Sequence, residues 1–303
     1  MGGRQKKGAG VLFPQAASWG WSIAVASCFS YACCPTSKQT GQVLPRISGN
    51  ILMSSISVLV NGANGRMGSE VVKAVQAAAG YELAGETDLG DDLAAAIENS
   101  SPQVVVDFTV PSSAVENTNI ILDSGACPVV GTTGFSSEEI KSLQEKAAGL
   151  GRGGLIAPNF AIGAVLLMKF AQQAARYLPD VEVIELHHDQ KVDAPSGTAL
   201  KTIELIREGL ESSDSAAPAE RPEETETVTG ARGGRYLGIP VHSVRLPGYV
   251  AHEEVLFGGT GQVLSIRHDS ISRTSFMPGV LLAVSKVVEL DRLYYGLDQV
   301  MDL

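Results

Sequence analysis

The densest group of reactive side chains lies in one short stretch, ELHHDQKVDAPSGTA, which covers residues 185–199. His187 and His188 are adjacent, and Lys191 follows three residues after the second histidine. A histidine titrates near neutral pH, and a suitably placed lysine can donate a proton. Because the two histidines end a predicted strand, their side chains should point to opposite faces of a sheet. The spacing predicts proton transfer beside a bound anion.

The same stretch continues into a predicted helix that starts around Ser196, Gly197 and Thr198. Free N–H groups at a helix start attract a carboxylate or phosphate. We therefore predict a site for a small carboxylated substrate that is protonated as a hydride adds to it. Ser196 also suits a purely structural role as the helix N-cap, and Lys191 also suits a solvated surface position. Metal binding by residues 187–189 would need adjacent ligands, which are geometrically awkward, so we predict no metal.

A glycine-rich turn, GANGRMG, follows the first predicted strand and opens a helix. Glycines let the backbone turn sharply and approach a pyrophosphate, while the helix start supplies N–H groups and a positive dipole. Glycine turns also occur for structural reasons alone, but the strand–turn–helix context favours a dinucleotide site. The predicted contacts are Gly62, Ala63, Asn64, Gly65, Arg66, Met67 and Gly68.

Asp88 strengthens this prediction because it lies 20 residues after Gly68, at the end of the second predicted strand. A carboxylate at that place binds the hydroxyls of the adenine ribose. It would repel a 2′-phosphate, and the next residue, Leu89, is not basic, although Arg66 offers partial compensation. We predict that NADH serves at least as well as NADPH. The structural alternative for Asp88 is a solvated loop acid.

Further strand ends in this half carry hydroxyl, amide and backbone groups at the edge where open α/β sheets bind ligands. Each of these loops alone is typical of plain turn chemistry, but together they predict contacts to the nicotinamide half of the cofactor. The predicted contacts are Gly131, Thr132, Thr133, Ala157, Pro158, Asn159 and Phe160.

Short apolar runs that alternate with helical stretches must position these loops. Strands are predicted over 56–61, 81–87, 104–108, 128–132 and 155–158, and helices over 67–79, 92–98, 112–124 and 136–148. Ser136 and Glu139 have the spacing of a capping box. The alternation predicts a Rossmann-like α/β domain with a parallel sheet and helices on both faces.

The second half has a different pattern. Helices are predicted over 161–177, 198–210 and 278–289, and strands over 181–188, 238–246, 250–257 and 262–268. The last three strands lack intervening helices, which predicts an α+β domain with a mostly antiparallel sheet. Residues 211–229 are acidic and rich in Ser, Pro and Thr, so we predict a surface loop there.

Residues 1–53 differ in composition from the remainder. They hold five basic residues, no acid and three of the four cysteines, and their apolar run is shorter than a membrane span. This pattern predicts a targeting segment, of plastid type, that would lead to the stroma. The alternative is that Met53 is the true start and the protein is cytoplasmic. The single remaining cysteine, Cys127, fits a reducing compartment.

Overall composition excludes several classes of protein. The 303 residues are 44% hydrophobic and 18% charged, which argues against disordered, collagen-like or coiled-coil chains. The formal net charge of −10 argues against nucleic acid or an anionic membrane surface as the main partner. Beyond the leader we predict no membrane span.

From residue 56 to residue 303 the chain resembles the 4-hydroxy-tetrahydrodipicolinate reductase (dihydrodipicolinate reductase) family. The stretch ELHHDQKVDAPSGTA is nearly diagnostic, and GANGRMG, VVDFTVP, GTTGF and APNFAIG stand in the family's order. The segments APNFAIGAVLL and HSVRLPG are most similar to the cyanobacterial and plastid branch. The resemblance implies NAD(P)H-dependent reduction of 4-hydroxy-tetrahydrodipicolinate to tetrahydrodipicolinate, with loss of water, in the diaminopimelate route to lysine.

The resemblance also implies residue roles. The family's catalytic histidine corresponds to His187 and its proton-donating lysine to Lys191. The substrate-binding positions correspond to His188, Gly197 and Thr198, with Ser196 as a further carboxylate contact. The turn at 62–68, Asp88 and the loops at 131–133 and 157–160 match the cofactor loops. Arg273 and Phe276 lie in a segment that resembles the family's return to the cofactor domain.

The same resemblance implies the organisation of the chain. We expect a leader at 1–53, a dinucleotide-binding domain at 54–159, a substrate-binding and oligomerisation domain at 160–267, and a return to the first domain at 268–303. Family members are usually homotetramers joined through the antiparallel sheet, so we expect a homotetramer. The chain departs from the family in its leader, in a shorter stretch between Asp88 and Val104, and in Leu89, where many members carry a basic residue.

Other functions fit parts of the sequence. A different two-domain NAD(P) oxidoreductase would not need HHDQK combined with PSGT. A dinucleotide-binding redox sensor without catalysis would not need His187 and Lys191. A structural subunit would use the acidic loop at 211–229 to bind a partner.

Overall fold

The computed structural model describes Gly2, residues 55–212 and residues 225–303. The chain divides into two units, Met1–Ile51 and Leu52–Leu303, and the second contains every helix and strand given below. The predicted leader, apart from Gly2, and most of the predicted acidic loop lie outside the described residues.

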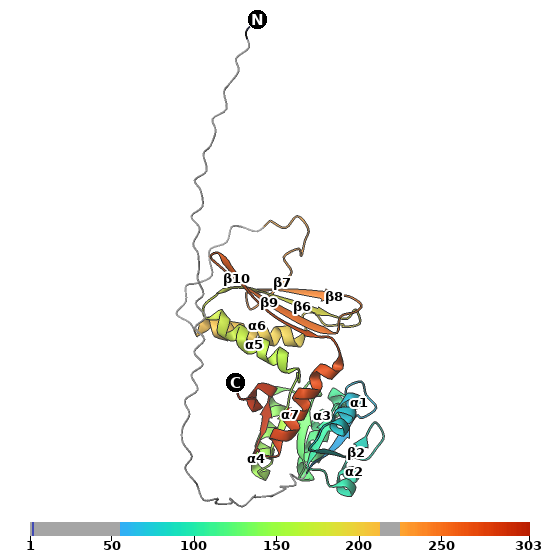
Figure 1. Ribbon diagram of the computed structural model, residues 1–303. Coiled ribbons are helices and arrows are strands. Elements are labelled where there is room, and N and C mark those ends of the chain that lie inside the picture. The colour runs from blue at the N-terminus through green and yellow to red at the C-terminus, as the bar shows by residue number, and fades with distance from the viewer. Residues whose placement is uncertain (1, 3–54, 213–224) are drawn as a thin grey trace, which may run out of the picture. The chain divides into compact units, whose positions relative to one another are not determined.

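The first sheet has six strands, all parallel, in the order β11-β5-β4-β3-β1-β2 (Figure 1). The strands are β1 (Ile56–Asn61), β2 (Tyr81–Thr87), β3 (Val104–Asp107), β4 (Cys127–Val130), β5 (Gly154–Ile156) and β11 (Leu293–Tyr295). The predicted Rossmann-like parallel sheet is confirmed. β11 was not predicted, because three residues are too few to show an alternating pattern. The chain places β2 and β3 on opposite sides of β1, so a topological switch point lies between β1 and β3.

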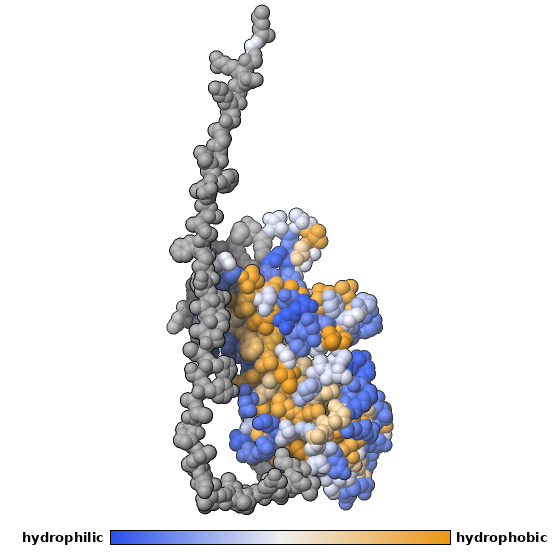
Figure 2. Space-filling view, in the orientation of Figure 1, coloured by the Kyte–Doolittle hydropathy of each residue, from blue (hydrophilic) through white to orange (hydrophobic). Residues whose placement is uncertain are grey.

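Five helices flank this sheet. They are α1 (Gly68–Ala77), α2 (Leu93–Ser100), α3 (Pro111–Asp123), α4 (Ser137–Leu150) and α7 (Met277–Val287). The predicted capping box is confirmed, since the Ser136 hydroxyl accepts from the Glu139 N–H and the Glu139 carboxylate accepts from the Ser136 N–H. The edge of the molecule that carries α1, β2 and α2 is largely hydrophilic (Figure 2).

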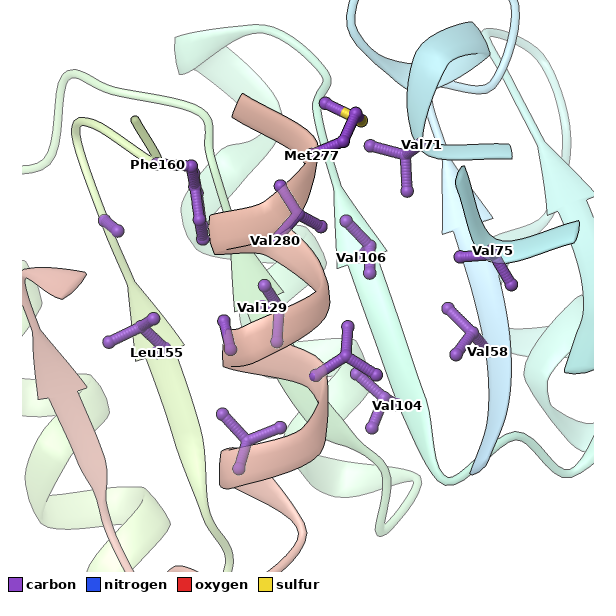
Figure 3. Packing of buried hydrophobic residues seen from close by; sticks show 14 of the residues in the cluster. Val58, Val71, Val75, Val104, Val106, Val129, Leu155, Phe160, Met277 and Val280 are labelled. Atoms are coloured by element: carbon purple, nitrogen blue, oxygen red, sulfur yellow. The ribbon is translucent and has the colours of Figure 1, made fainter. Parts of the chain in front are cut away.

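The last long helix of the chain completes the core of this first sheet. In Figure 3, Val280 of α7 points toward Val106 of β3 and Val129 of β4, and all three are fully buried. Val71 and Val75 of α1 extend the same cluster. Helices α2, α3 and α4 contribute to two further buried apolar clusters. These clusters contain the strand residues that alternate with those of the first cluster, such as Leu59, Val105 and Val130. Helices therefore cover both faces, and the loops at the strand ends rest on a rigid core.

The second sheet has the order β10-β9-β6-β8-β7. Its strands are β6 (Asp180–His187), β7 (Gly234–Tyr236), β8 (Ile239–Arg245), β9 (Ala251–Gly259) and β10 (Gln262–Ser270). Every pair is antiparallel except β6 and β8, so the prediction of a mostly antiparallel sheet is confirmed. β6 and β8 run parallel, and α6 (Gly197–Glu211) lies between these two strands in the chain.

Helices α5 (Ile162–Ala175) and α6 lie side by side against one face of this second sheet (Figure 1). Val183, Val241 and Val255 of three adjacent strands pack against them. Alternation along β6 places Glu185 and His187 on the same face as Val183. The apolar core therefore gives way to charged residues at the end of β6. Two short 3-10 helices, η1 (Arg273–Phe276) and η2 (Leu297–Val300), flank α7 and β11. None of the helices that the structure describes is long and apolar enough to cross a membrane.

Candidate active site

A cleft of about 680 Å³ opens at the carboxyl ends of the first sheet's strands. The register explains its position, because Asn61, Thr87 and Asp107 end their strands as aligned neighbours. The loops that follow these strands therefore emerge at one edge, across the switch point between β1 and β3. A volume of this size lies within the range of small-molecule and cofactor sites.

The glycine turn at this cleft needs its glycines for steric reasons. Gly62 has φ of +82°, and a Cβ there would lie 2.6 Å from the Phe108 carbonyl oxygen. A Cβ on Gly68 would lie 2.0 Å from the Gly62 carbonyl oxygen, so only glycine lets α1 start this close to the turn. The result is a backbone cradle in front of a helix start, an arrangement that fits the pyrophosphate of a dinucleotide.

Asp88 lies beside the glycine turn and lines the same cleft. Its carboxylate accepts from the backbone N–H groups of Leu89 and Asn64, each at 2.7 Å. These two hydrogen bonds lower the pKa of Asp88 below its usual value. Asp88 is therefore ionised at neutral pH, and its neighbour Leu89 is 99% exposed and adds no charge.

A buried carboxylate supports the other loops of the cleft. Asp107, at the end of β3, is fully buried and accepts from five donors. Asn61 Nδ2 and Asn117 Nδ2 donate to one oxygen at 2.7 and 2.9 Å, while the backbone N–H and hydroxyl of Thr109 and the Thr132 hydroxyl donate to the other at 2.8–3.2 Å. This network joins side chains from three strand ends and one helix.

The structure separates the predicted cofactor contacts into two groups. Those that line the cleft are Gly62, Gly65, Arg66, Met67, Asp88, Gly131, Thr132 and Thr133. Those that do not are Ala63, Asn64, Gly68, Ala157, Pro158, Asn159, Phe160, Arg273 and Phe276. Ala157 and Phe160 are core residues, and Phe276 packs against that core, so their side chains support the loops from behind.

The charged residues of the second sheet meet at the end of β6. The buried Glu185 carboxylate accepts from His187 Nδ1 at 2.5 Å and from two Arg245 nitrogens at 2.7 and 2.9 Å. The Ser196 N–H adds a longer contact at 3.3 Å. Burial alone would raise the pKa of Glu185, but the hydrogen bonds from His187, Arg245 and Ser243 lower it to about 2. Glu185 is thus ionised at neutral pH, and its carboxylate holds the His187 ring through Nδ1.

Lys191 lies in the loop after β6, with its side chain mostly shielded from solvent. Its ammonium group contacts both carboxylate oxygens of Asp193, at 2.8 and 2.9 Å. The hydrogen bond from Lys191 lowers the pKa of Asp193. Asp193 is also linked to Glu185 through Arg245. The Arg245 Nη2 atom that donates to Glu185 also donates to the Asp193 carbonyl oxygen at 2.7 Å. Lys191 is therefore held in a charged network and not left as an isolated surface cation.

The start of α6 lies beside these groups. Ser196 is buried and is the N-cap, since its hydroxyl accepts from the Ala199 N–H at 3.2 Å. The N-cap role considered for Ser196 is therefore confirmed. Gly197 at the helix start is exposed. Thr198 accepts from Asn159 Nδ2 at 3.3 Å, so this bond connects the loop after β5 to the helix start.

Four supporting residues were missed by sequence reasoning: Glu185, Asp193, Arg245 and Asp107. Glu185 lies two positions before His187, so strand alternation would have placed both on one face. Arg245 lies 60 residues away from Glu185, and no local pattern connects them. His188 follows the end of β6 and is half-buried. Among the described residues, no group of three or more His, Cys, Asp or Glu could hold a metal.

Models of one protein family match nearly all of the unit Leu52–Leu303. Residues 56–160 match the family model "Dihydrodipicolinate reductase, N-terminus", and residues 163–301 match "Dihydrodipicolinate reductase, C-terminus". A 4-hydroxy-tetrahydrodipicolinate reductase from Halalkalibacterium halodurans is 48% identical over 267 residues, which are 82% of this chain and 100% of the relative. One from Geobacillus kaustophilus is 48% identical over 268 residues, with the same two shares.

A solved structure shows the same architecture. The dipicolinate-bound dihydrodipicolinate reductase from Paenisporosarcina sp. TG-14 aligns with a TM-score of 0.75 and 42% sequence identity. The alignment covers 82% of this chain and 100% of that one.

Proposed function

The chain belongs to the dihydrodipicolinate reductase family and is an NAD(P)H-dependent oxidoreductase, and from this premise we propose how its residues divide the reaction. The reaction is the reduction of 4-hydroxy-tetrahydrodipicolinate to tetrahydrodipicolinate in lysine biosynthesis. It consumes one hydride and one proton and releases one water. Bound NAD(P)H supplies the hydride.

The cofactor is held, in this proposal, at the cleft of the first sheet. The turn at Gly62–Gly68 and the start of α1 bind the pyrophosphate, and Asp88 binds the adenine ribose. The strand-end loops at 131–133 and 157–160, with Arg273 and Phe276, bind or support the nicotinamide half. We propose that NADH serves at least as well as NADPH, because the ionised Asp88 repels a 2′-phosphate and Leu89 offers no cation, while Arg66 offsets this repulsion in part.

The substrate is held at the end of β6. His188, Ser196, Gly197 and Thr198 bind its carboxylates, with the start of α6 as the main N–H donor. Lys191 supplies the proton and His187 stabilises the developing charge, while Glu185 and Arg245 position both. The observation that carries this assignment is the network in which Glu185 orients His187 and Arg245 connects Glu185 to Asp193, the partner of Lys191. The dipicolinate bound to the related reductase is a small dicarboxylate of the kind this site would hold.

The oxidation of NADH and NADPH by the full chain tests this function, with the substrate generated in situ by a dihydrodipicolinate synthase. We expect oxidation by the wild type and a fall in kcat of about 10²–10⁴-fold for Lys191→Ala, because a positioned proton donor contributes that much. Lys141→Ala, which removes a lysine exposed on α4, is the matched control and should leave kcat unchanged. Binding of NADH without oxidation would instead indicate a catalytically silent sensor.

We propose that copies of the chain form a homotetramer through the second sheet. Among the described helices, only α5 and α6 cover this sheet, and both lie on one face. At its edge, β10 exposes Val263 and Leu264. Size-exclusion chromatography with light scattering would give the mass of the particle in solution. We expect the mass of four chains, and the mass of one chain at the concentration used for the activity assay would contradict the proposal.

The location of the protein remains a separate proposal, that residues 1–53 direct it to the plastid stroma. N-terminal sequencing of the native protein tests it. A mature chain that begins near residue 53, together with a longer precursor, is expected; a start at Met53 without a precursor would favour the cytoplasm.

A further inference from the structure

A second buried glutamate lies directly across the sheet from Glu185. Glu253 of β9 is the cross-strand partner of Glu185 in the antiparallel β6–β9 pair. Side chains opposed in this way have Cβ atoms about 4.5–5.5 Å apart, and two like charges there destabilise the sheet. Glu253 is only 5% exposed, and its Oε1 atom is buried without a hydrogen-bond partner among the residues that the structure describes. The reaction as proposed above gives Glu253 no role.

The surroundings of Glu253 favour its neutral form. From α6, the Thr202 hydroxyl interacts with the Glu253 carboxyl group, but it has a single proton, which it shares with the Thr198 carbonyl oxygen at 3.0 Å. From β10, the opposing residue is His268, whose pKa is lowered mainly by burial, so it offers no positive charge at neutral pH. A buried carboxylate without such a partner is costly, and the group keeps its proton instead.

The cationic side chains of the neighbouring strands and of α5, which packs against β9, are paired with other anions. From β6 and β8, His187 and Arg245 both donate to Glu185. From α5, the Lys169 ammonium lies 2.8 Å from Asp298. Asp269 on β10 is bound to Arg267 and His252 and faces the other side of the sheet. Burial raises the pKa of Glu253, the Thr202 hydroxyl opposes this and the charge of Glu185 adds to it, with a result of about 7.

We infer that Glu253 is a positioning residue whose carboxyl group must stay neutral for Glu185, Arg245 and His187 to present a site that accepts a dicarboxylate. Its ionisation places a second negative charge opposite Glu185. That charge competes for Arg245 and His187 and repels a dianionic ligand. This inference rests on the proposed function and adds a pH-dependent control of affinity for the carboxylated substrate.

Binding of dipicolinate to the full chain, measured by calorimetry from about pH 6 to about pH 8, tests this inference. Both ligand carboxylates stay ionised over that range. We expect only protein with a neutral Glu253 to bind dipicolinate well. Over this pH range the affinity of the wild type for dipicolinate should then fall by up to about tenfold more than that of Glu253→Gln. The amide of glutamine has the shape of the neutral acid and cannot ionise. Glu254→Gln makes the same chemical change at the next residue, which is bound to Arg267 on the opposite face, and should behave as the wild type.

Infrared spectroscopy provides a readout that does not depend on activity or on a ligand. We expect a carbonyl band of a buried protonated carboxylic acid in the wild type at about pH 6, absent in Glu253→Gln and present in Glu254→Gln. A missing band, or the same pH dependence of affinity in wild type and Glu253→Gln, would overturn the inference and leave the proposed function in place. Failure of the wild type to bind dipicolinate at any pH would overturn both.

Discussion

The two sheets of this protein build their binding groups from different materials. At the edge of the first sheet, the cleft is shaped by backbone that approaches backbone, as at Gly62 and Gly68, and its one fully buried anion, Asp107, is satisfied by neutral donors. At the end of β6, charged side chains carry the site, and Glu185 is held by Arg245 and His187. We therefore expect binding at the first site to depend mainly on the shape of the backbone, and function at the second site to depend mainly on charge.

The largest effect is expected where charge is removed without a change of shape. Glu185→Gln should lower kcat by roughly 10²-fold or more, because His187 loses the carboxylate that orients its ring. It should also lower the free energy of unfolding by about 3 kcal/mol at neutral pH, because the partners of a buried ion pair are left uncompensated. Steady-state kinetics and urea unfolding measure the two effects.

The pH dependence of this variant has a defined sign. The pKa of Glu185 falls from 4.5 to about 2 on folding, so its contribution is present above about pH 4.5 and is lost as the pH falls toward 2. The stability gap between Glu185→Gln and wild type should therefore close in acid. Glu182→Gln, on the opposite face of the same strand, is the control for kcat. An unchanged kcat in Glu185→Gln would show that charge does not limit this site.

An intermediate effect is expected from one added carbon in the first site. Gly68→Ala places a Cβ against the Gly62 carbonyl oxygen, which must shift the turn and cost about 1–3 kcal/mol of stability. We expect the KM for NADH to rise by about tenfold or more, with a smaller change in the KM for the dicarboxylate. Gly149→Ala in α4, where a Cβ meets open space, is the matched control. Equal changes in both KM values would mean that the two sites are not built independently.

The smallest effect tests the carboxylate that the first site presents to the adenine ribose. Asp88→Ala removes a hydrogen-bonding carboxylate, so we expect the KM for NADH to rise by about tenfold and the KM for NADPH by less. Glu86→Gln, two residues earlier and exposed on β2, should change neither. An equal rise of the KM for NADH and for NADPH would contradict the ribose-binding role of Asp88 and indicate that it is a solvated loop residue.

Much of the fold was predictable because its signals are local. Buried runs such as 56–61 and 104–107, the glycine turn and the capping box at Ser136 each depend on a few neighbouring residues. The short strands β7 and β11 were not predicted, because three residues form a strand only when a neighbouring strand offers its free edge. The parallel pairing of β6 with β8 likewise depends on where α6 returns the chain.

The sequence by itself determined the chemistry of this protein: which residues can titrate, where the backbone must be glycine, and which family motifs are present in order. Only the tertiary structure decided the state of these groups. It placed Arg245 beside Glu185 across 60 residues of chain, gathered five donors around Asp107, and set Glu253 opposite the ionised Glu185. The reason is physical, since burial and the distance to other charges control protonation, and both are properties of the folded chain.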